Sequence, residues 1–295
     1  TYPIPDWIPT HSLVYQQRFP QPGDTPPDVR IGIVAANGGD TVWMHVPMSR
    51  HNDYIPRFGW LDNRHVWIEV LRRDHRHMEL FFADAETGEV RRVLAETAHT
   101  FFDENYDMHF LPGGQFLWSS WRDGHTHLYL YRYDAGNPMA SDATLVRQLT
   151  RGDWEVLSVA GVDGKGVVYY TSNETDPRQE MLWEIHLDGS GKKMLSTMPG
   201  VHRISFAPDA SHYVDTASSL RQPPTVSVCS VAGECASFWH SHPLDEYKLV
   251  APTMFTGKAV DGTTLYGELL LPPDLHDAAS VPLIVNPYGG PHVQT

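Results

Sequence analysis

The stretch that decides the fold is Arg57-Phe-Gly-Trp-Leu-Asp-Asn-Arg-His-Val-Trp-Ile-Glu-Val-Leu71, followed by Glu79-Leu-Phe-Phe-Ala83 and Val90-Arg-Arg-Val-Leu94. Its short runs of aromatic and β-branched residues are separated by turn sequences such as Asp62-Asn63 and Thr87-Gly88. Runs of this kind, bounded by turn residues, are typical of β-strands. The stretch therefore predicts four antiparallel strands, over 57–61, 65–71, 79–83 and 90–94.

The same four-strand pattern returns three times along the chain. The further predicted strands cover 108–111, 115–119, 127–131 and 144–149, then 156–159, 166–170, 181–185 and 193–195, then 204–206, 211–215 and a hairpin with two cysteines. The first turns of the rounds stand at Asp62, Gly113, Asp163 and Asp209, at intervals of roughly 50 residues. A single four-stranded sheet cannot bury both faces, so such sheets stack around an axis as propeller blades. We therefore expect a mainly β protein containing part of a β-propeller, with a β-sandwich as the competing fold.

The segment before the first round has a different character. Seven prolines fall within residues 1–30 and predict mostly loop structure there. After it, the runs 29–34 and 41–46 flank a Gly38-Gly39 turn and predict two strands, the outer half of another blade.

Composition limits the classes of partner. The chain has 295 residues, of which 41% are hydrophobic and 20% charged, an ordinary composition for a folded protein. The net charge of -14 argues against a nucleic-acid partner, because the phosphate backbone attracts cationic surfaces. No apolar run approaches the ~18 residues of a membrane-spanning helix, and no signal peptide is visible.

The two cysteines, Cys229 and Cys235, flank the hairpin tip Val231-Ala-Gly-Glu234. If residues 230 and 234 pair, the cysteines face each other across the two strands. Two free, half-buried thiols are the simpler expectation, and a tight disulfide is the alternative. A disulfide would favour a periplasmic or secreted location over a cytoplasmic one, because disulfides persist in oxidising compartments.

The last stretch combines an apolar run with a sharp turn. Residues 281–285 predict a buried strand that stops at Pro287, and Tyr288-Gly-Gly-Pro291 then predicts an exposed turn at its carboxyl end. In open α/β sheets ligands gather at that edge, so the Tyr288 hydroxyl is a candidate catalytic group. A surface tyrosine in a strand-ending turn is the alternative. Upstream, Asp261-Gly262 predicts a hairpin between strands beginning near Met254 and Leu265.

Several of these motifs resemble one known family. Pro282-Leu-Ile-Val-Asn-Pro-Tyr-Gly-Gly-Pro-His292 resembles the start of the catalytic domain in the prolyl oligopeptidase family of serine peptidases, and 257–273 resembles that domain's entry hairpin. Residues 15–27 resemble, in weakened form, a linker between propeller blades of the dipeptidyl peptidase IV branch. The resemblance implies that residues 1–245 belong to an eight-bladed propeller and that residues 246–295 begin an α/β-hydrolase domain. We expect the chain to be part of a longer protein.

The resemblance also implies a function for that whole protein. Members of this branch are serine exopeptidases that release dipeptides from free peptide amino termini, preferring Pro or Ala at the second position, through an acyl-enzyme. Carried over, Tyr288 donates its hydroxyl to the oxyanion hole. Phe101 or Phe102 lines the substrate, although Asp103-Glu104 stand where the family has an arginine. The whole protein is expected to take such peptides as partners and to be able to form a homodimer.

Some expected parts are missing from the sequence. No G-x-S-x-G nucleophile motif and no paired glutamates for the substrate's amino terminus occur, so we expect the chain to be inactive alone. His75-x-His77 and His125-x-His127 lack a third ligand at zinc spacing, so no metal and no cofactor are expected. Two alternatives stay open: an acylaminoacyl peptidase or oligopeptidase of the same clan, and a non-catalytic propeller that binds proteins.

Overall fold

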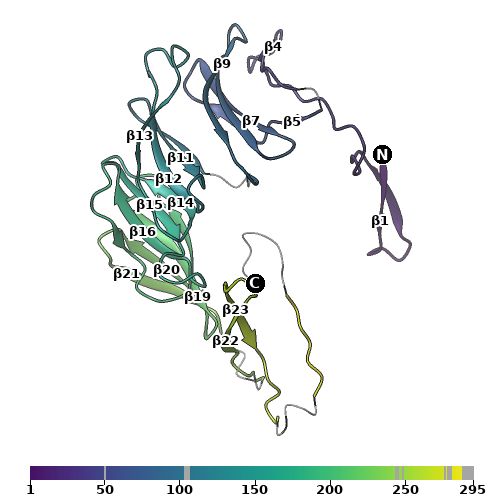
Figure 1. The fold of residues 1–295 in the computed structure, drawn as a ribbon, viewed down its shortest axis with the longest axis vertical. Coiled ribbons are helices and arrows are strands. Elements are labelled where there is room, and N and C mark those ends of the chain that lie inside the picture. The colour runs from purple at the N-terminus through teal and green to yellow at the C-terminus, as the bar shows by residue number, and fades with distance from the viewer. Residues whose placement is uncertain are drawn as a thin grey trace. The chain divides into compact units, whose positions relative to one another are not determined.

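The computed structural model describes residues 1–49, 51–102, 107–242, 246–247, 249–275, 277 and 281–287. Within these residues all regular secondary structure consists of β-strands, as Figure 1 shows. The chain divides into two compact units, one of residues 1–122 with 129–147 and one of residues 123–128 with 148–295.

The first complete blade lies in the first unit and confirms the strands predicted between residues 57 and 94. Its strands are β6 (Phe58–Trp60), β7 (His65–Arg72), β8 (His77–Asp84) and β9 (Val90–Thr97), each antiparallel to the next. A short further strand, β5 (Asp53–Tyr54), pairs with the end of β7 beside β6. The central strands β7 and β8 are largely buried, as expected for the middle of a stacked sheet.

Both faces of this blade carry a hydrophobic core, which is the physical reason for stacking sheets. One face packs Ile68, Val70 and Phe81 with Ile31 and Met44. The other face contributes Leu71, Leu80 and Phe82 to a second cluster that also contains residues of the next blade, namely Phe116, Trp118, Tyr129 and Tyr131. Burying two faces against two neighbours is what a propeller blade requires and what a single isolated sheet cannot achieve.

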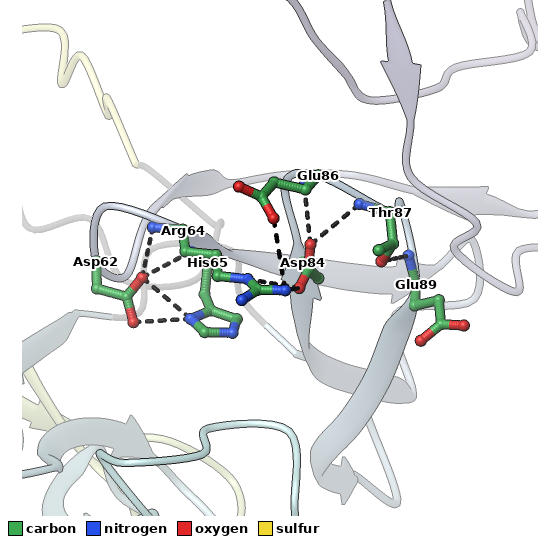
Figure 2. Close-up of polar contacts among 7 residues, drawn as sticks. All are labelled: Asp62, Arg64, His65, Asp84, Glu86, Thr87 and Glu89. Carbon is green, nitrogen blue, oxygen red and sulfur yellow. Dashed lines mark hydrogen bonds and ion pairs between the residues drawn. The ribbon is translucent and has the colours of Figure 1, made fainter.

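Two turns at one end of this blade are joined by charged side chains (Figure 2). In the β6–β7 turn, Asp62 accepts hydrogen bonds from the backbone N–H groups of Arg64 and His65, both at 2.7 Å. In the β8–β9 turn, the Asp84 carboxylate accepts two hydrogen bonds from backbone N–H groups and a third from Arg64 Nε at 2.8 Å. Burial raises the pKa of both aspartates, but the hydrogen bonds from backbone N–H groups and from the side chains of His65 and Arg64 lower it by more, so the pKa of each lies below its ordinary value. This network fixes the turns and is structural.

The remaining rounds follow the predicted spacing. In the first unit, β3 (Gly32–Ile33) pairs with β4 (Val42–Trp43). The next blade consists of β10 (Met108–Leu111), β11 (Gln115–Ser120), β12 (His127–Arg132) and β13 (Thr144–Gln148), and most of its residues belong to the first unit. The second unit holds two blades: β14 (Val156–Val162), β15 (Val167–Ser172), β16 (Met181–His186) and β17 (Lys193–Met194), then β18 (Val201–Phe206), β19 (His212–Ser219), β20 (Gln222–Ser230) and β21 (Cys235–His240). Consecutive four-stranded antiparallel sheets of this kind form a β-propeller region rather than a sandwich.

The cysteine hairpin has the predicted register but not the favoured thiol state. Cys229 on β20 pairs directly with Cys235 on β21, with 4.1 Å between the Cα atoms, and the two sulfur atoms are bonded. The expectation of two free thiols is therefore wrong. The short Cα separation of facing residues in an antiparallel pair places two cysteine side chains within bonding reach.

The amino-terminal segment is more regular than its prolines suggested. β1 (Tyr2–Asp6) and β2 (Leu13–Gln17) form an antiparallel hairpin. Pro3 and Pro5 are two residues apart, so their nitrogens, which lack a hydrogen, face the same edge of the strand. Proline is tolerated in a strand when that edge is the unpaired one, which is why the prediction of a loop failed here.

The carboxyl-terminal prediction is confirmed in its hairpin and wrong in its last strand. β22 (Thr253–Lys258) and β23 (Thr264–Leu269) form the expected hairpin around Asp261-Gly262. Residues 281–287 form no strand and are exposed. No sheet pairing in the described part of the chain includes this run. Without a partner strand, its backbone N–H and C=O groups have no ladder partners and its apolar side chains are not buried.

Candidate substrate-facing site

The structure describes two of the three predicted site residues, Phe101 and Phe102. Tyr288 lies outside the described residues. Phe101 and Phe102 follow β9, and their side chains differ sharply in exposure: Phe101 is 46% exposed, whereas Phe102 is 1% exposed within the hydrophobic cluster of the first two blades. Of the two, only Phe101 presents a side chain that a ligand can contact.

The segment that carries these phenylalanines is attached to the turn between β7 and β8. Ala98 donates its backbone N–H to the Arg76 carbonyl at 2.9 Å, and Arg76 Nε donates to the Thr100 carbonyl at 3.3 Å. Phe102 donates its backbone N–H to the His75 carbonyl at 2.6 Å. A segment with no regular structure of its own is thus held along one side by a neighbouring turn.

Aromatic rings continue this attachment at the surface. The Phe101 ring stacks on the imidazole of His75, with 4.7 Å between centroids and 6° between planes. Tyr54, at the end of β5, meets the same imidazole edge-on at 6.2 Å. Offset and edge-to-face contacts between rings are each worth about 0.5–1.5 kcal/mol beyond the area that they bury.

Between β9 and β11 a polar network joins the two blades that flank this segment. Glu96 on β9 accepts hydrogen bonds from Trp118 Nε1 and Arg122, both at 2.8 Å, and also from the Ser120 hydroxyl. Arg122 donates in addition to the Tyr131 hydroxyl at 2.9 Å. Burial lowers the pKa of Arg122, but the charge of Glu96 and the bond to Tyr131 raise it above its ordinary value. The network joins the end of β9 to β11 and β12 of the next blade.

The sequence pattern alone does not indicate this network. Its members come from three strands and one turn, so no short spacing in the sequence links them. The sequence shows only an acidic residue, Glu96, and an arginine, Arg122, and these two residue types alone do not indicate that the side chains pair with each other.

One carboxyl group in the middle of the same blade is buried, and one of its two oxygen atoms accepts no hydrogen bond from the described residues. Glu69 in the middle of β7 is 3% exposed, and none of the described residues hydrogen-bonds to its Oε1 atom. Burial raises the pKa of Glu69 to about 7, although the charge of Arg57 lowers it in part. A carboxyl group in such surroundings is partly protonated near neutral pH.

The described residues contain no group of three or more His, Cys, Asp and Glu side chains placed to hold a metal ion. His125 and His127 instead contact each other edge-on, and His127 packs against Trp154 and hydrogen-bonds to Thr150 and Gly152. In the part of the chain that the structure describes, no helix has the length and apolar character needed to cross a membrane.

Comparison with known proteins assigns the family. The family model of the dipeptidyl peptidase IV N-terminal region matches residues 1–224, about three quarters of the chain. The chain belongs to the dipeptidyl peptidase IV family. Among curated relatives, a probable dipeptidyl-aminopeptidase B of Emericella nidulans is 25% identical over 96% of the chain, and dipeptidyl peptidase 8 of Mus musculus is 24% identical over 82%. The chain spans about a third of the length of these relatives.

Solved structures agree on the fold. The crystal structure of Porphyromonas gingivalis dipeptidyl peptidase 4 matches 93% of the chain with a TM-score of 0.81 at 24% identity. A putative dipeptidyl aminopeptidase IV from Bacteroides ovatus matches with a TM-score of 0.75 at 23% identity. The match covers 39% and 41% of those chains, respectively. The propeller region predicted from the sequence repeat is therefore confirmed.

Proposed function

We propose that this chain is part of a serine exopeptidase that releases dipeptides from the free amino termini of peptides, preferring Pro or Ala as the second residue. The observation that carries the proposal is the family match over residues 1–224. The Pro282–His292 motif, which resembles the start of a hydrolase domain, adds to it. In this proposal residues 1–245 help to form the propeller that orients the substrate, and residues 246–295 begin the catalytic domain.

Tyr288 supplies the oxyanion stabilisation in this proposal. A serine hydroxyl outside this chain attacks the carbonyl carbon of the second residue, and the carbonyl oxygen becomes an oxyanion in the tetrahedral intermediate. The phenol of Tyr288, in the sequence Pro287-Tyr-Gly-Gly-Pro291, donates a hydrogen bond to that oxygen. Loss of one such donor lowers kcat by ~10²–10³. This chain contains no nucleophile motif, so we expect residues 1–295 alone to be inactive.

Phe101 is the substrate-contacting residue of the propeller in this proposal. Its exposed aromatic face suits the side chain of the substrate's first residue, whereas Phe102 supports the segment from within the core. The charge of -14 gives a weak attraction for the cationic amino terminus of a peptide. The disulfide favours a periplasmic or secreted location.

Three chromogenic substrates test this function in the full-length protein: Gly-Pro with a free amine, Gly-Pro with a blocked amine, and a single aminoacyl compound. Each is measured with the wild type and with Tyr288→Phe. We expect preference for the free Gly-Pro substrate and a large loss of kcat in the variant.

The same experiment separates the alternatives. Preference for the blocked substrate would move the protein to the acylaminoacyl peptidase or oligopeptidase class. No turnover of any substrate, with the protein shown to be folded, would favour a propeller that binds proteins without catalysis. Turnover by purified residues 1–295, verified by intact mass, would contradict the expected inactivity of the chain alone.

A further inference from the structure

His75 holds a backbone conformation that few residues other than glycine adopt. Its φ is 53°, in the left-handed region, where histidine is among the more tolerant side chains. Conformations of this kind persist only where surrounding contacts hold them, and they concentrate at functional sites. The contacts of His75 therefore indicate what the conformation achieves.

Two hydrogen bonds and one ring contact of His75 lead to the segment after β9. The His75 carbonyl accepts the Phe102 backbone N–H at 2.6 Å, and His75 Nδ1 lies 3.1 Å from the Phe102 carbonyl oxygen. Because a carbonyl oxygen only accepts, Nδ1 carries the hydrogen in this contact. Two hydrogen bonds between the same two residues, 27 positions apart, fix the backbone on either side of Phe102.

This attachment determines where the two phenylalanines point. Phe102 is directed into the hydrophobic core, and the preceding Phe101 is directed to the surface, against the imidazole of His75. The near-parallel stack covers one face of the Phe101 ring, and Tyr54 supports the imidazole from its edge. Phe101 nevertheless stays 46% exposed. The result is a surface aromatic ring held from behind.

We propose that His75 is a positioning residue that holds Phe101 as one wall of the subsite for the side chain of the substrate's first residue. This inference rests on the proposed dipeptidyl peptidase function. A ring that is already fixed loses less conformational freedom when a ligand side chain packs on it. The preference for a large apolar first residue over glycine therefore depends on Phe101 and, through it, on His75.

The test compares kcat/KM for Ile-Pro and Gly-Pro chromogenic substrates in the full-length protein. Phe101→Ala removes the wall, and we expect it to lower the ratio for Ile over Gly by about three- to tenfold. His75→Asn keeps a donor near the Phe102 carbonyl and tolerates a positive φ, but it removes the stacked ring. We expect it to lower the ratio by a similar factor.

The double variant distinguishes positioning from an independent effect. If His75 acts through Phe101, His75→Asn combined with Phe101→Ala lowers the ratio no further than Phe101→Ala alone. His77→Asn is the matched control, since His77 lies two residues later and hydrogen-bonds to Thr97 instead. We expect it to leave the ratio unchanged.

Clear outcomes would overturn the inference. Additive effects in the double variant, or an unchanged ratio in a folded and active His75→Asn variant, would show that His75 does not position Phe101. If His75→Asn does not fold, His75→Gly replaces it, because glycine adopts the same φ without strain. Wild-type protein that hydrolyses neither substrate would instead refute the proposed function, and the inference with it.

Discussion

The buried carboxyl group of Glu69 makes the stability of the first blade depend on pH. Its pKa rises from an ordinary 4.5 to about 7 in the folded protein because burial disfavours the charged form. Between these values the folded state binds more protons than the unfolded state, so stability falls as pH rises through that window. Each pKa unit corresponds to about 1.4 kcal/mol, which gives a loss of about 3 kcal/mol by about pH 8.

Replacing the carboxylate with a neutral amide of the same shape removes this loss. We expect Glu69→Gln to match the wild type at about pH 4 and to exceed its stability by about 3 kcal/mol at about pH 8. Urea unfolding of the full-length protein, followed by tryptophan fluorescence, measures the difference at both pH values. Glu89→Gln, which changes an exposed carboxylate at the β8–β9 turn, is the matched control and should show no such gain. A Glu69→Gln variant that is less stable than wild type at pH 8 would refute the reasoning.

Three further predictions concern the other buried interactions. Burial lowers the pKa of His202, but hydrogen bonds to Asp215 and to the Met198 carbonyl raise it above its ordinary value. The stability that His202 contributes is therefore present at acid pH and is lost as the pH rises through this raised pKa. His202→Gln should therefore destabilise the protein more at about pH 6 than at about pH 9, and an equal loss at both would contradict this. Glu96→Gln leaves the half-buried charge of Arg122 without its carboxylate and should cost about 3 kcal/mol in urea unfolding, whereas a loss below about 0.5 kcal/mol would show that the pair contributes little. Reduction of Cys229–Cys235 should cost about 2 kcal/mol, because the bond closes only a short loop, and alkylation of both thiols in unfolded, unreduced protein would show that no disulfide exists.

The strands of the blades were predictable because their signal is local. Alternating apolar residues and turn sequences near Asp62, Gly113, Asp163 and Asp209 specify each strand and its neighbours without reference to distant parts of the chain. The amino-terminal hairpin was missed because proline content says nothing about which edge of a strand is paired.

The site was predictable only in part, since its geometry depends on residues far apart in the sequence. Sequence resemblance placed both Phe101 and Phe102 in one candidate segment but did not show which side chain faces the core. That distinction comes from His75, which holds the backbone of Phe102 from another turn. The Glu96–Arg122 pair likewise forms only when β9 and the end of β11 are brought together.

The identity of the first product tests the central claim most directly. Full-length protein is incubated with a decapeptide that has a free amino terminus and Pro at position two, and the products are followed by mass spectrometry. We expect release of the amino-terminal dipeptide and an intact octapeptide as the first products. Cleavage inside the peptide, or removal of a single residue, would contradict it.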